Sequence, residues 1–222
     1  LELIEQYNFT YEQWQGSALS PMVIEHFLIH SPWEEVDAND GKTEIVLDPG
    51  VVFGTGLHPT TEDCLKAMAH LHGQSPLRSV LDLGTGTGIL ALAAVLLGAE
   101  KVLAVDLNPL SVKTAQRNVR LNGLEGSIEV VKGRAEDFVA ERADLVVANL
   151  HHSVIVNLLD KEGFLQKGWI IISGLLRSEA REIRHQLGEY DLDVVREWDH
   201  EGTWYTLLVR NGNLSGRGVI AC

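Results

Sequence analysis

The segment VLDLGTGTG, residues 80–88, decides the fold of this chain. It begins as an apolar run interrupted by Asp82 and ends in three alternating glycines, Gly84, Gly86 and Gly88. Glycines between an apolar strand and a helix permit a tight turn and a close approach of the backbone to a ligand, which then faces the helix N-terminal amides. The segment therefore predicts an α/β fold whose first parallel strand ends at a ligand site.

The rest of the chain continues this alternation of strand-like and helix-like segments. Such alternation is typical of a parallel sheet with crossover helices. The last two strand-like segments, residues 192–198 and 203–209, have only a turn between them and predict an antiparallel hairpin that closes the sheet. The other expected strands are residues 78–83, 101–105, 127–131, 143–148 and 169–173, and the expected helices are residues 89–97, 110–121, 154–165 and 177–187.

The N-terminal part of the chain has a less regular pattern. Residues 1–57, with apolar runs at 23–29 and 43–47, predict a linker or a small antiparallel β accessory segment. A helix begins near Pro59, with Thr60, Glu62 and Asp63 as its N-terminal capping cluster. We expect the main domain to span residues 58–210 and a flexible tail to span residues 211–222.

Composition and charge narrow the class of protein. The 222 residues include 31 acidic and 18 basic side chains, a net charge of −13 that is spread along the chain. This charge disfavours a nucleic-acid partner but would attract a basic polypeptide, or it only maintains solubility. No apolar run reaches the length of a membrane span, so we expect no membrane partner and a cytoplasmic location. Cys64 and Cys222 lie too far apart to suggest a disulfide framework or a zinc site, and we expect Cys64 to be buried.

The spacing of the glycines indicates the kind of ligand. It is G-x-G-x-G, unlike the G-x-G-x-x-G of dinucleotide dehydrogenases, and no Lys-Ser or Lys-Thr follows as in a phosphate-binding loop. Asp82 would place a negative charge close to a pyrophosphate, whereas it could face the α-ammonium of a methionine moiety. The turn therefore favours S-adenosylmethionine, with a nicotinamide-dependent oxidoreductase as the alternative.

Asp106 ends the second strand of the expected sheet. A carboxylate at that position can accept hydrogen bonds from the two ribose hydroxyls of a nucleoside. It could instead cap the following helix, but Asn108 already provides a cap before Pro109 at the first helical position. We therefore expect Asp106 to bind ribose.

Asn149 ends the fourth strand, at the carboxyl edge of the sheet where open α/β folds bind ligands. Its amide carbonyl could accept a hydrogen bond from a nitrogen nucleophile and aim the lone pair at a methyl group; a plain turn or cap role is the alternative. We expect the next residues, His151 and His152, to be loop histidines rather than metal ligands. One of them could border the substrate entrance. Residues 133–138 could recognise an adenine amino group or begin a helix.

The segment LDPGVVFGTGLHPTT, residues 47–61, resembles the PrmA-type ribosomal protein lysine methyltransferases, and residues 80–88, 105–109 and 148–150 match later motifs of that family in order. The resemblance spans residues 20–210 and implies a Rossmann-like class I fold that uses S-adenosylmethionine. It also assigns cofactor contacts, carried here by Thr61, Gly84, Asp106 and Asn149, while Phe53 and His58 would line the same pocket.

The resemblance implies methylation of a lysine or α-amine of a ribosomal protein. Family members carry an N-terminal substrate-recruiting domain ahead of a linker, and the resemblance implies that this chain, which starts at Leu1, begins within that linker. Either that domain has been removed or the chain is a shorter relative with another substrate. The family pattern also has other residues where Leu150, His151 and His152 follow Asn149. Methylation of another protein or a small molecule, and a non-catalytic binding module, remain alternatives, and the sequence leaves the oligomeric state open.

Overall fold

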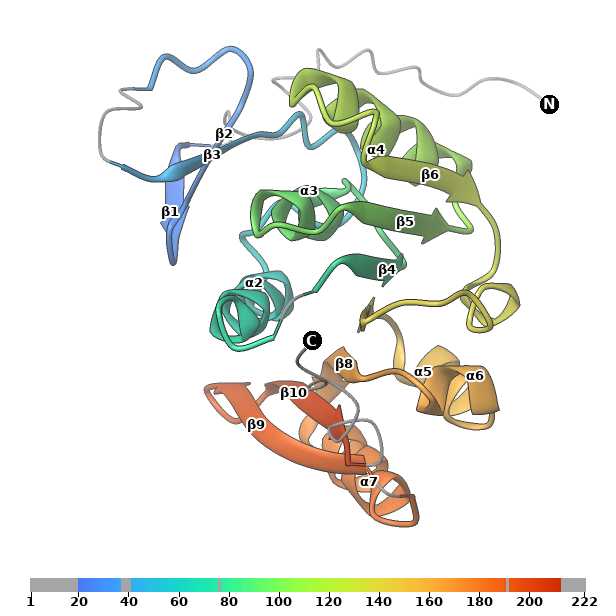
Figure 1. Cartoon of the computed structure of the whole chain (residues 1–222). Helices are drawn as coiled ribbons and strands as arrows, with labels where there is room; N and C mark the ends of the chain where they lie inside the picture. The colour runs from blue at the N-terminus through green and yellow to red at the C-terminus, as the bar shows by residue number, and fades with distance from the viewer. Residues whose placement is uncertain (1–19, 37–40, 76, 191, 213–222) are drawn as a thin grey trace, which may run out of the picture.

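A computed structural model describes residues 20–36, 41–75, 77–190 and 192–212, and it is organised around a seven-stranded sheet. The strand order is β6-β5-β4-β7-β8-β10-β9 (Figure 1). These strands are β4 (Ser79–Leu83), β5 (Lys101–Asp106), β6 (Ile128–Lys132), β7 (Leu145–Asn149), β8 (Trp169–Leu176), β9 (Leu192–His200) and β10 (Trp204–Asn211).

The sheet confirms the predicted combination of parallel strands and a closing hairpin. Strands β6, β5, β4, β7 and β8 run parallel, while β10 is antiparallel to both β8 and β9. The hairpin inserts its second strand, β10, next to β8, which leaves β9 at the edge of the sheet. The inner strands β4, β7 and β8 are buried on both faces and therefore read as nearly continuous apolar runs, whereas the edge strand β6 is only partly buried.

Helices cover both faces of the sheet. The contacts of α2, α3 and α4 place their buried residues in one apolar cluster with Val80, Val102 and Val147, whereas α5, α6 and α7 pack with Leu81 and Val146 in a second. Successive residues of one strand thus point to opposite faces, as the strand periodicity requires. The helices are α2 (Pro59–Leu71), α3 (Ile89–Leu96), α4 (Pro109–Leu121), α5 (His152–Leu159), α6 (Glu162–Leu165) and α7 (Arg177–Leu187), with a 3-10 turn η2 (Ala135–Asp137).

Two helical predictions are wrong in detail. The helix expected at 154–165 is two helices, because Lys161 is extended between α5 and α6 and Gly163 packs against the Val139 carbonyl, where a Cβ would lie 2.8 Å from the oxygen. The N-cap of α2 is His58 rather than the predicted capping cluster, because Pro59 takes the first helical position and the His58 side chain accepts the Thr60 backbone N–H.

The N-terminal strands form a separate small sheet of β1 (Met22–Ile24), β2 (Phe27–His30) and β3 (Thr43–Val46). Strands β1 and β2 are antiparallel as expected, but β3 runs parallel to β2, so the predicted antiparallel unit is only partly confirmed. Helix α4 holds this sheet: the Asn122 side chain donates to the Val46 carbonyl at 2.7 Å and accepts the Val46 N–H at 3.0 Å.

The remaining sequence predictions concern the two cysteines, the C-terminal tail and membrane spans. Cys64 is fully buried, as predicted, whereas Cys222 and residues 213–222 of the expected tail lie outside the described residues. In the part of the chain that the structure describes, none of the helices has both the length and the apolar character that a bilayer span needs.

Candidate functional site

A cavity of about 960 Å³ opens at the carboxyl ends of the parallel strands. It lies where the strand order changes direction: β5 flanks β4 on one side and β7 flanks it on the other, so successive crossovers leave a crevice between them. Its lining combines residues from these strand ends with others from distant parts of the chain. They are Phe53, His58, Thr60, Gly84, Gly86, Val105, Asp106, Leu107, Ser111, Gly133, Arg134, Ala135, Glu136, Asn149, Leu150, His151, Val154, Gly174, Leu176, Glu179 and Trp204.

The predicted glycine turn forms the floor of this cavity. Gly84 and Gly86 have φ angles of +78° and +57°, a region that side-chain-bearing residues rarely adopt. The backbone N–H groups of Gly84 and Thr85 both donate to the Val105 carbonyl, at 2.8 and 3.0 Å, which ties the turn to β5. A Cβ on Gly86 would overlap the Phe53 carbonyl oxygen. The turn therefore needs glycine both for its conformation and for the close approach of a neighbouring segment.

That neighbouring segment is the loop before α2, which contains Phe53. Thr87 N–H donates to the Phe53 carbonyl at 3.0 Å, and the Thr87 hydroxyl donates to the Gly54 carbonyl. The buried Asn118 side chain on α4 then joins the loop and the turn, since its Nδ2 donates to the carbonyls of both Asp48 and Thr87 at 3.0 and 2.8 Å. The phenyl ring of Phe53 is thereby held at the cavity with half of its surface exposed.

Asp106 stands at the carboxyl end of β5 and lines the cavity, as predicted. One carboxylate oxygen accepts the Gly86 N–H at 2.9 Å, and the other accepts the Asn108 N–H at 2.8 Å. A carboxylate has about four acceptor positions, so two remain for ligand hydroxyls. The Asn108 side chain caps α4 through Leu110 N–H at 3.0 Å, which confirms that Asp106 is not needed as the cap.

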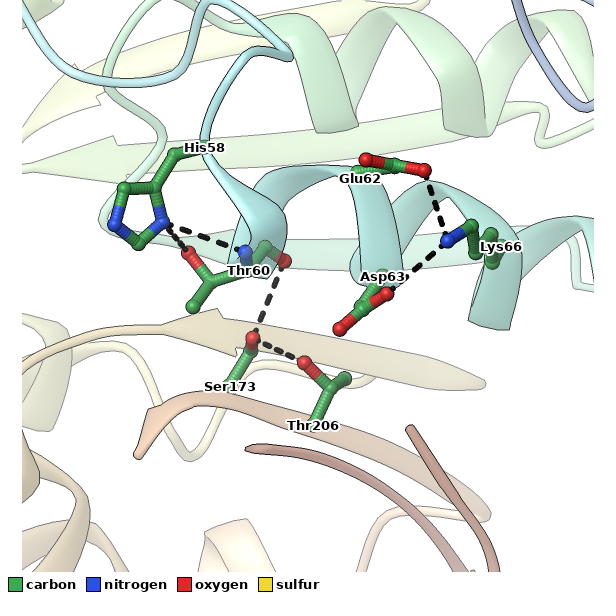
Figure 2. Close-up of polar contacts among 7 residues, drawn as sticks. All are labelled: His58, Thr60, Glu62, Asp63, Lys66, Ser173 and Thr206. Atoms are coloured by element: carbon green, nitrogen blue, oxygen red, sulfur yellow. Dashed lines mark hydrogen bonds and ion pairs between the residues drawn. The ribbon is translucent and has the colours of Figure 1, made fainter. Parts of the chain in front are cut away.

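Asn149 ends β7 on the other side of the glycine turn and also lines the cavity. Its Nδ2 donates to the Thr60 hydroxyl oxygen at 3.3 Å. Figure 2 shows that Thr60 in turn contacts His58, whose Nδ1 lies 2.8 Å from the hydroxyl oxygen. Ser173 of β8 donates to the Thr60 carbonyl at 3.2 Å, which fixes the first turn of α2 against the sheet.

Thr61 and Asp82, two predicted cofactor-binding residues, do not line the cavity. Thr61 is buried in the first turn of α2, and Asp82 is buried on the face of β4 that packs against α2 and α3. Asp82 accepts the Thr85 hydroxyl at 2.6 Å, and its burial raises the pKa of its carboxyl to about 7. Thr61 Oγ1 and Asp82 Oδ1 are among the described buried polar atoms without a hydrogen-bond partner. The structure places Thr60, not Thr61, at the cavity wall.

The loop after β6 brings further groups that the sequence suggested only weakly. Residues 133–136 line the cavity, and η2 begins at Ala135, which agrees with the helix-start interpretation; recognition of an adenine amino group stays a prediction. The Arg134 guanidinium contacts the Glu136 carboxylate at 3.2 Å. A hydrogen bond from its own backbone N–H, opposed by burial and supported by Arg134, lowers the pKa of Glu136.

Trp204 lines the cavity although no sequence pattern indicated it, whereas Phe53, His58 and one loop histidine were expected there. Trp204 of β10 stacks edge-on with His58 at 4.9 Å between ring centroids, and Phe53 approaches the same imidazole at 5.1 Å. His151 lines the cavity and caps α5, in agreement with the prediction that one loop histidine borders the entrance, whereas His152 lies 3.2 Å from Glu182. These groups meet only because the terminal hairpin and the loop before α2 fold over the same strand ends.

Comparison with known proteins identifies the family. A profile described as ribosomal protein L11 methyltransferase (PrmA) matches residues 5–212. The chain is 35% identical over 208 residues to the ribosomal protein L11 methyltransferase of Heliobacterium modesticaldum, covering 92% of this chain and 65% of that protein. The corresponding protein of Carboxydothermus hydrogenoformans is 37% identical over 90% of this chain and 66% of its own length.

Solved structures give the same result. The crystal structure of the ribosomal protein L11 methylase from Lactobacillus delbrueckii subsp. bulgaricus superposes with a TM-score of 0.72 at 29% identity, over 84% of this chain and 95% of that one. The tRNA methyltransferase TrmK of B. subtilis, at 21% identity and a TM-score of 0.55 over 67% of this chain and 65% of that one, shares the fold. The chain spans just under two thirds of the Heliobacterium protein, and it belongs to the PrmA family of ribosomal protein L11 methyltransferases.

Proposed function

We propose that this chain transfers a methyl group from S-adenosylmethionine to a lysine ε-amine or an α-amine of a ribosomal protein. The observation that carries the proposal is the convergence of the Asp106 carboxylate and the Asn149 amide on one cavity, on opposite sides of the glycine turn. A carboxylate can hold a ribose, and an amide oxygen can orient an amine.

The cavity fits the cofactor in size and in polar groups. Its volume is at the upper end of the range of about 300–1,000 Å³ for small-molecule sites. Asp106 would accept the ribose hydroxyls, and the turn from Gly84 to Gly86 would allow the ligand to approach the backbone. When bound, the cofactor supplies an electrophilic methyl group on a sulfonium sulfur.

The chain's own contribution to the reaction would be positioning. The Asn149 carbonyl oxygen can accept an N–H of the substrate amine and thereby direct its lone pair. Holding two reacting groups in an attack geometry can lower a barrier by about 7–11 kcal/mol, so a strong general base is unnecessary. The amine must still be neutral to react. Asp106, Glu136 and Glu179 line the cavity and would favour the ammonium form, so we expect turnover to rise with pH.

The proposed substrate is a basic ribosomal protein. The relatives named above are ribosomal protein L11 methyltransferases, and a chain with a net charge of −13 favours association with a positively charged polypeptide. A ribosomal protein would be met in the cytoplasm, so we propose that compartment. The net charge equally disfavours direct binding to nucleic acid.

The test is methyl transfer with radiolabelled S-adenosylmethionine. The chain is incubated with the ribosomal protein named for the family, with total ribosomal proteins, and with free lysine as a small-molecule acceptor. We expect label in the first ribosomal protein, at lysine or at its N-terminus by mass spectrometry. Label in free lysine alone would overturn the protein substrate, and no binding of S-adenosylhomocysteine in calorimetry would overturn the cofactor assignment.

A further inference from the structure

The side chains of His58, Thr60 and Asn149 form a continuous chain of hydrogen bonds at the cavity wall. His58 Nδ1 lies 2.8 Å from the Thr60 hydroxyl oxygen, which lies 3.3 Å from Asn149 Nδ2. All three residues line the cavity, although 89 positions of sequence separate Thr60 from Asn149. We propose that His58 and Thr60 are positioning residues that hold the Asn149 carbonyl oxygen toward the substrate amine, a role that rests on the proposed function.

The direction of these hydrogen bonds follows from one backbone group. The Thr60 N–H can only donate, and it donates to His58 Nδ1 at 3.3 Å as part of the helix cap. His58 Nδ1 must therefore be unprotonated, which places the ring proton on Nε2. The second contact to the same nitrogen, at 2.8 Å, then requires the Thr60 hydroxyl to donate its proton to it.

This assignment determines the orientation of the Asn149 amide. With its proton directed to His58, the Thr60 hydroxyl oxygen can only accept from Asn149, so Nδ2 and not Oδ1 faces Thr60. A rotated amide would set a lone pair against a lone pair. The other end of the amide, Oδ1, lies beside Gly174, another residue of the cavity wall, where an added Cβ would come within 3.2 Å of it.

The surroundings of His58 favour the neutral ring that this network needs. Its imidazole packs against Phe53 from its own loop and Trp204 from β10. Desolvation by this burial, followed by the charge of His200 at the end of β9, lowers the pKa of His58. Asp106, Glu136 and Glu179 line the same cavity from β5, η2 and α7. The hydrogen-bond network thus requires His58 as a neutral acceptor. In the helix cap, asparagine can take this role but alanine cannot.

The first experiment reads the tautomer directly. The whole chain is labelled with 15N-histidine, and two-bond 15N–1H NMR correlations are recorded at neutral pH. These correlations distinguish the two neutral forms of the imidazole ring. We expect His58 with the proton on Nε2 and, in Thr60→Val, a changed Nδ1 shift with the same tautomer. A proton on Nδ1, or a doubly protonated ring, would overturn the proposal whether or not the chain methylates a ribosomal protein.

The second experiment is a double-mutant cycle on turnover. We expect Thr60→Val to lower kcat by up to roughly tenfold with little change in KM, and Thr60→Ser to restore most of it. If Thr60 acts through Asn149, Thr60→Val should add no further loss to Asn149→Ala. Additive losses would show that Thr60 acts independently and would overturn the proposal.

A matched control comes from the cap of α5, which has the same local geometry. His151 Nδ1 accepts the Ser153 N–H at 3.4 Å and lies 3.0 Å from the Ser153 hydroxyl oxygen. Ser153 is exposed and does not line the cavity. We expect Ser153→Ala to leave kcat unchanged, so an equal loss in Ser153→Ala and Thr60→Val would assign the effect to helix capping alone.

Discussion

The Asp106 carboxylate accepts the backbone N–H of Gly86 at 2.9 Å, which joins the end of β5 to the glycine turn that follows β4. The same carboxylate accepts the Asn108 N–H at 2.8 Å, so two backbone amides hold its orientation at the cavity. Fixed in this way, Asp106 can offer its remaining acceptor positions to ligand hydroxyls without a loss of side-chain entropy on binding.

Replacing Asp106 should therefore remove cofactor affinity. We expect Asp106→Ala to weaken S-adenosylhomocysteine binding by at least roughly 100-fold, because two charge-assisted hydrogen bonds are lost. Isothermal titration calorimetry measures the affinity, and circular dichroism checks the fold. Asp193→Ala, which removes an exposed carboxylate 3.5 Å from Arg210, is the control and should bind normally. Unchanged affinity in Asp106→Ala would disprove the ribose assignment.

Asn149 should matter more for turnover than for binding. We expect Asn149→Ala to lower kcat by roughly 100-fold through loss of substrate orientation. The dissociation constant for S-adenosylhomocysteine should rise only a few-fold. Single-turnover methyl transfer and calorimetry separate the two effects. Normal turnover in this variant would exclude the proposed role of its amide.

The glycine turn allows a paired test of conformation and packing. Gly86 and Gly123 have similar φ angles, +57° and +66°, but a Cβ would overlap the Phe53 carbonyl at Gly86 and has no atom within 4 Å at Gly123. Gly123→Ala should therefore cost about 1–2 kcal/mol for conformation alone. Gly86→Ala should cost about 1–3 kcal/mol more through overpacking. Urea denaturation gives both free energies of unfolding, and equal losses would contradict the close approach of Phe53.

The buried carboxyl of Asp82 should make stability depend on pH. Burial raises its pKa to about 7, above the value of about 3.9 for an unfolded chain, so the folded state binds the proton more tightly. Its contribution to stability is complete below about pH 4 and is lost as the pH rises through about 7. Burial also raises the pKa of Asp63, which acts in the same direction.

Asp82→Asn should remove this dependence. Between pH 4 and pH 8 the free energy of unfolding of the native chain should fall by up to about 4 kcal/mol more than that of the variant. The reason is that the amide side chain at position 82 of the variant stays neutral at both pH values. Urea denaturation series at the two pH values measure the difference. A native chain whose free energy of unfolding changes with pH no differently from that of Asp82→Asn would contradict the raised pKa.

Asn118 should be important for stability. It is fully buried, and its amide bonds to the backbone of Asp48 and to the Thr87 carbonyl, whereas the amide of Asn122 is only partly buried. We expect Asn118→Ala to lower the free energy of unfolding by about 2–4 kcal/mol because it leaves buried backbone groups unpaired. Asn122→Ala should cost less. Equal losses of unfolding free energy in the two variants would show that the buried hydrogen bonds of Asn118 contribute no more than the partly buried ones of Asn122.

Much of the architecture could be predicted from local patterns. The apolar runs of β4, β5, β7 and β8, the helices between them and the hairpin were all expected within a few residues of their observed bounds. The exceptions have local structural causes. The helix expected at 154–165 breaks because Lys161 is extended and Gly163 packs against another segment, a contact that the helical pattern of the residues does not reveal.

The candidate site was predictable wherever a residue follows a strand of the parallel sheet. Asp106 and Asn149 end their strands, and parallel strands bring their carboxyl ends to one edge. The positions of Thr61 and Asp82 were not predictable in this way. Residues of a helix turn or a strand point to different faces according to how the element packs, and here both point into the interior and leave Thr60 at the cavity.

The sequence by itself determined the class of fold, the glycine turn and the identity of the strand-end residues, because these depend on periodicity and on conformations that only glycine adopts easily. Only the tertiary structure decided that Trp204 and Phe53 enclose His58, and that His58 reaches Asn149 through Thr60. Those contacts join segments separated by up to about 150 residues, and they form only when the hairpin and the loop before α2 pack over the same end of the sheet.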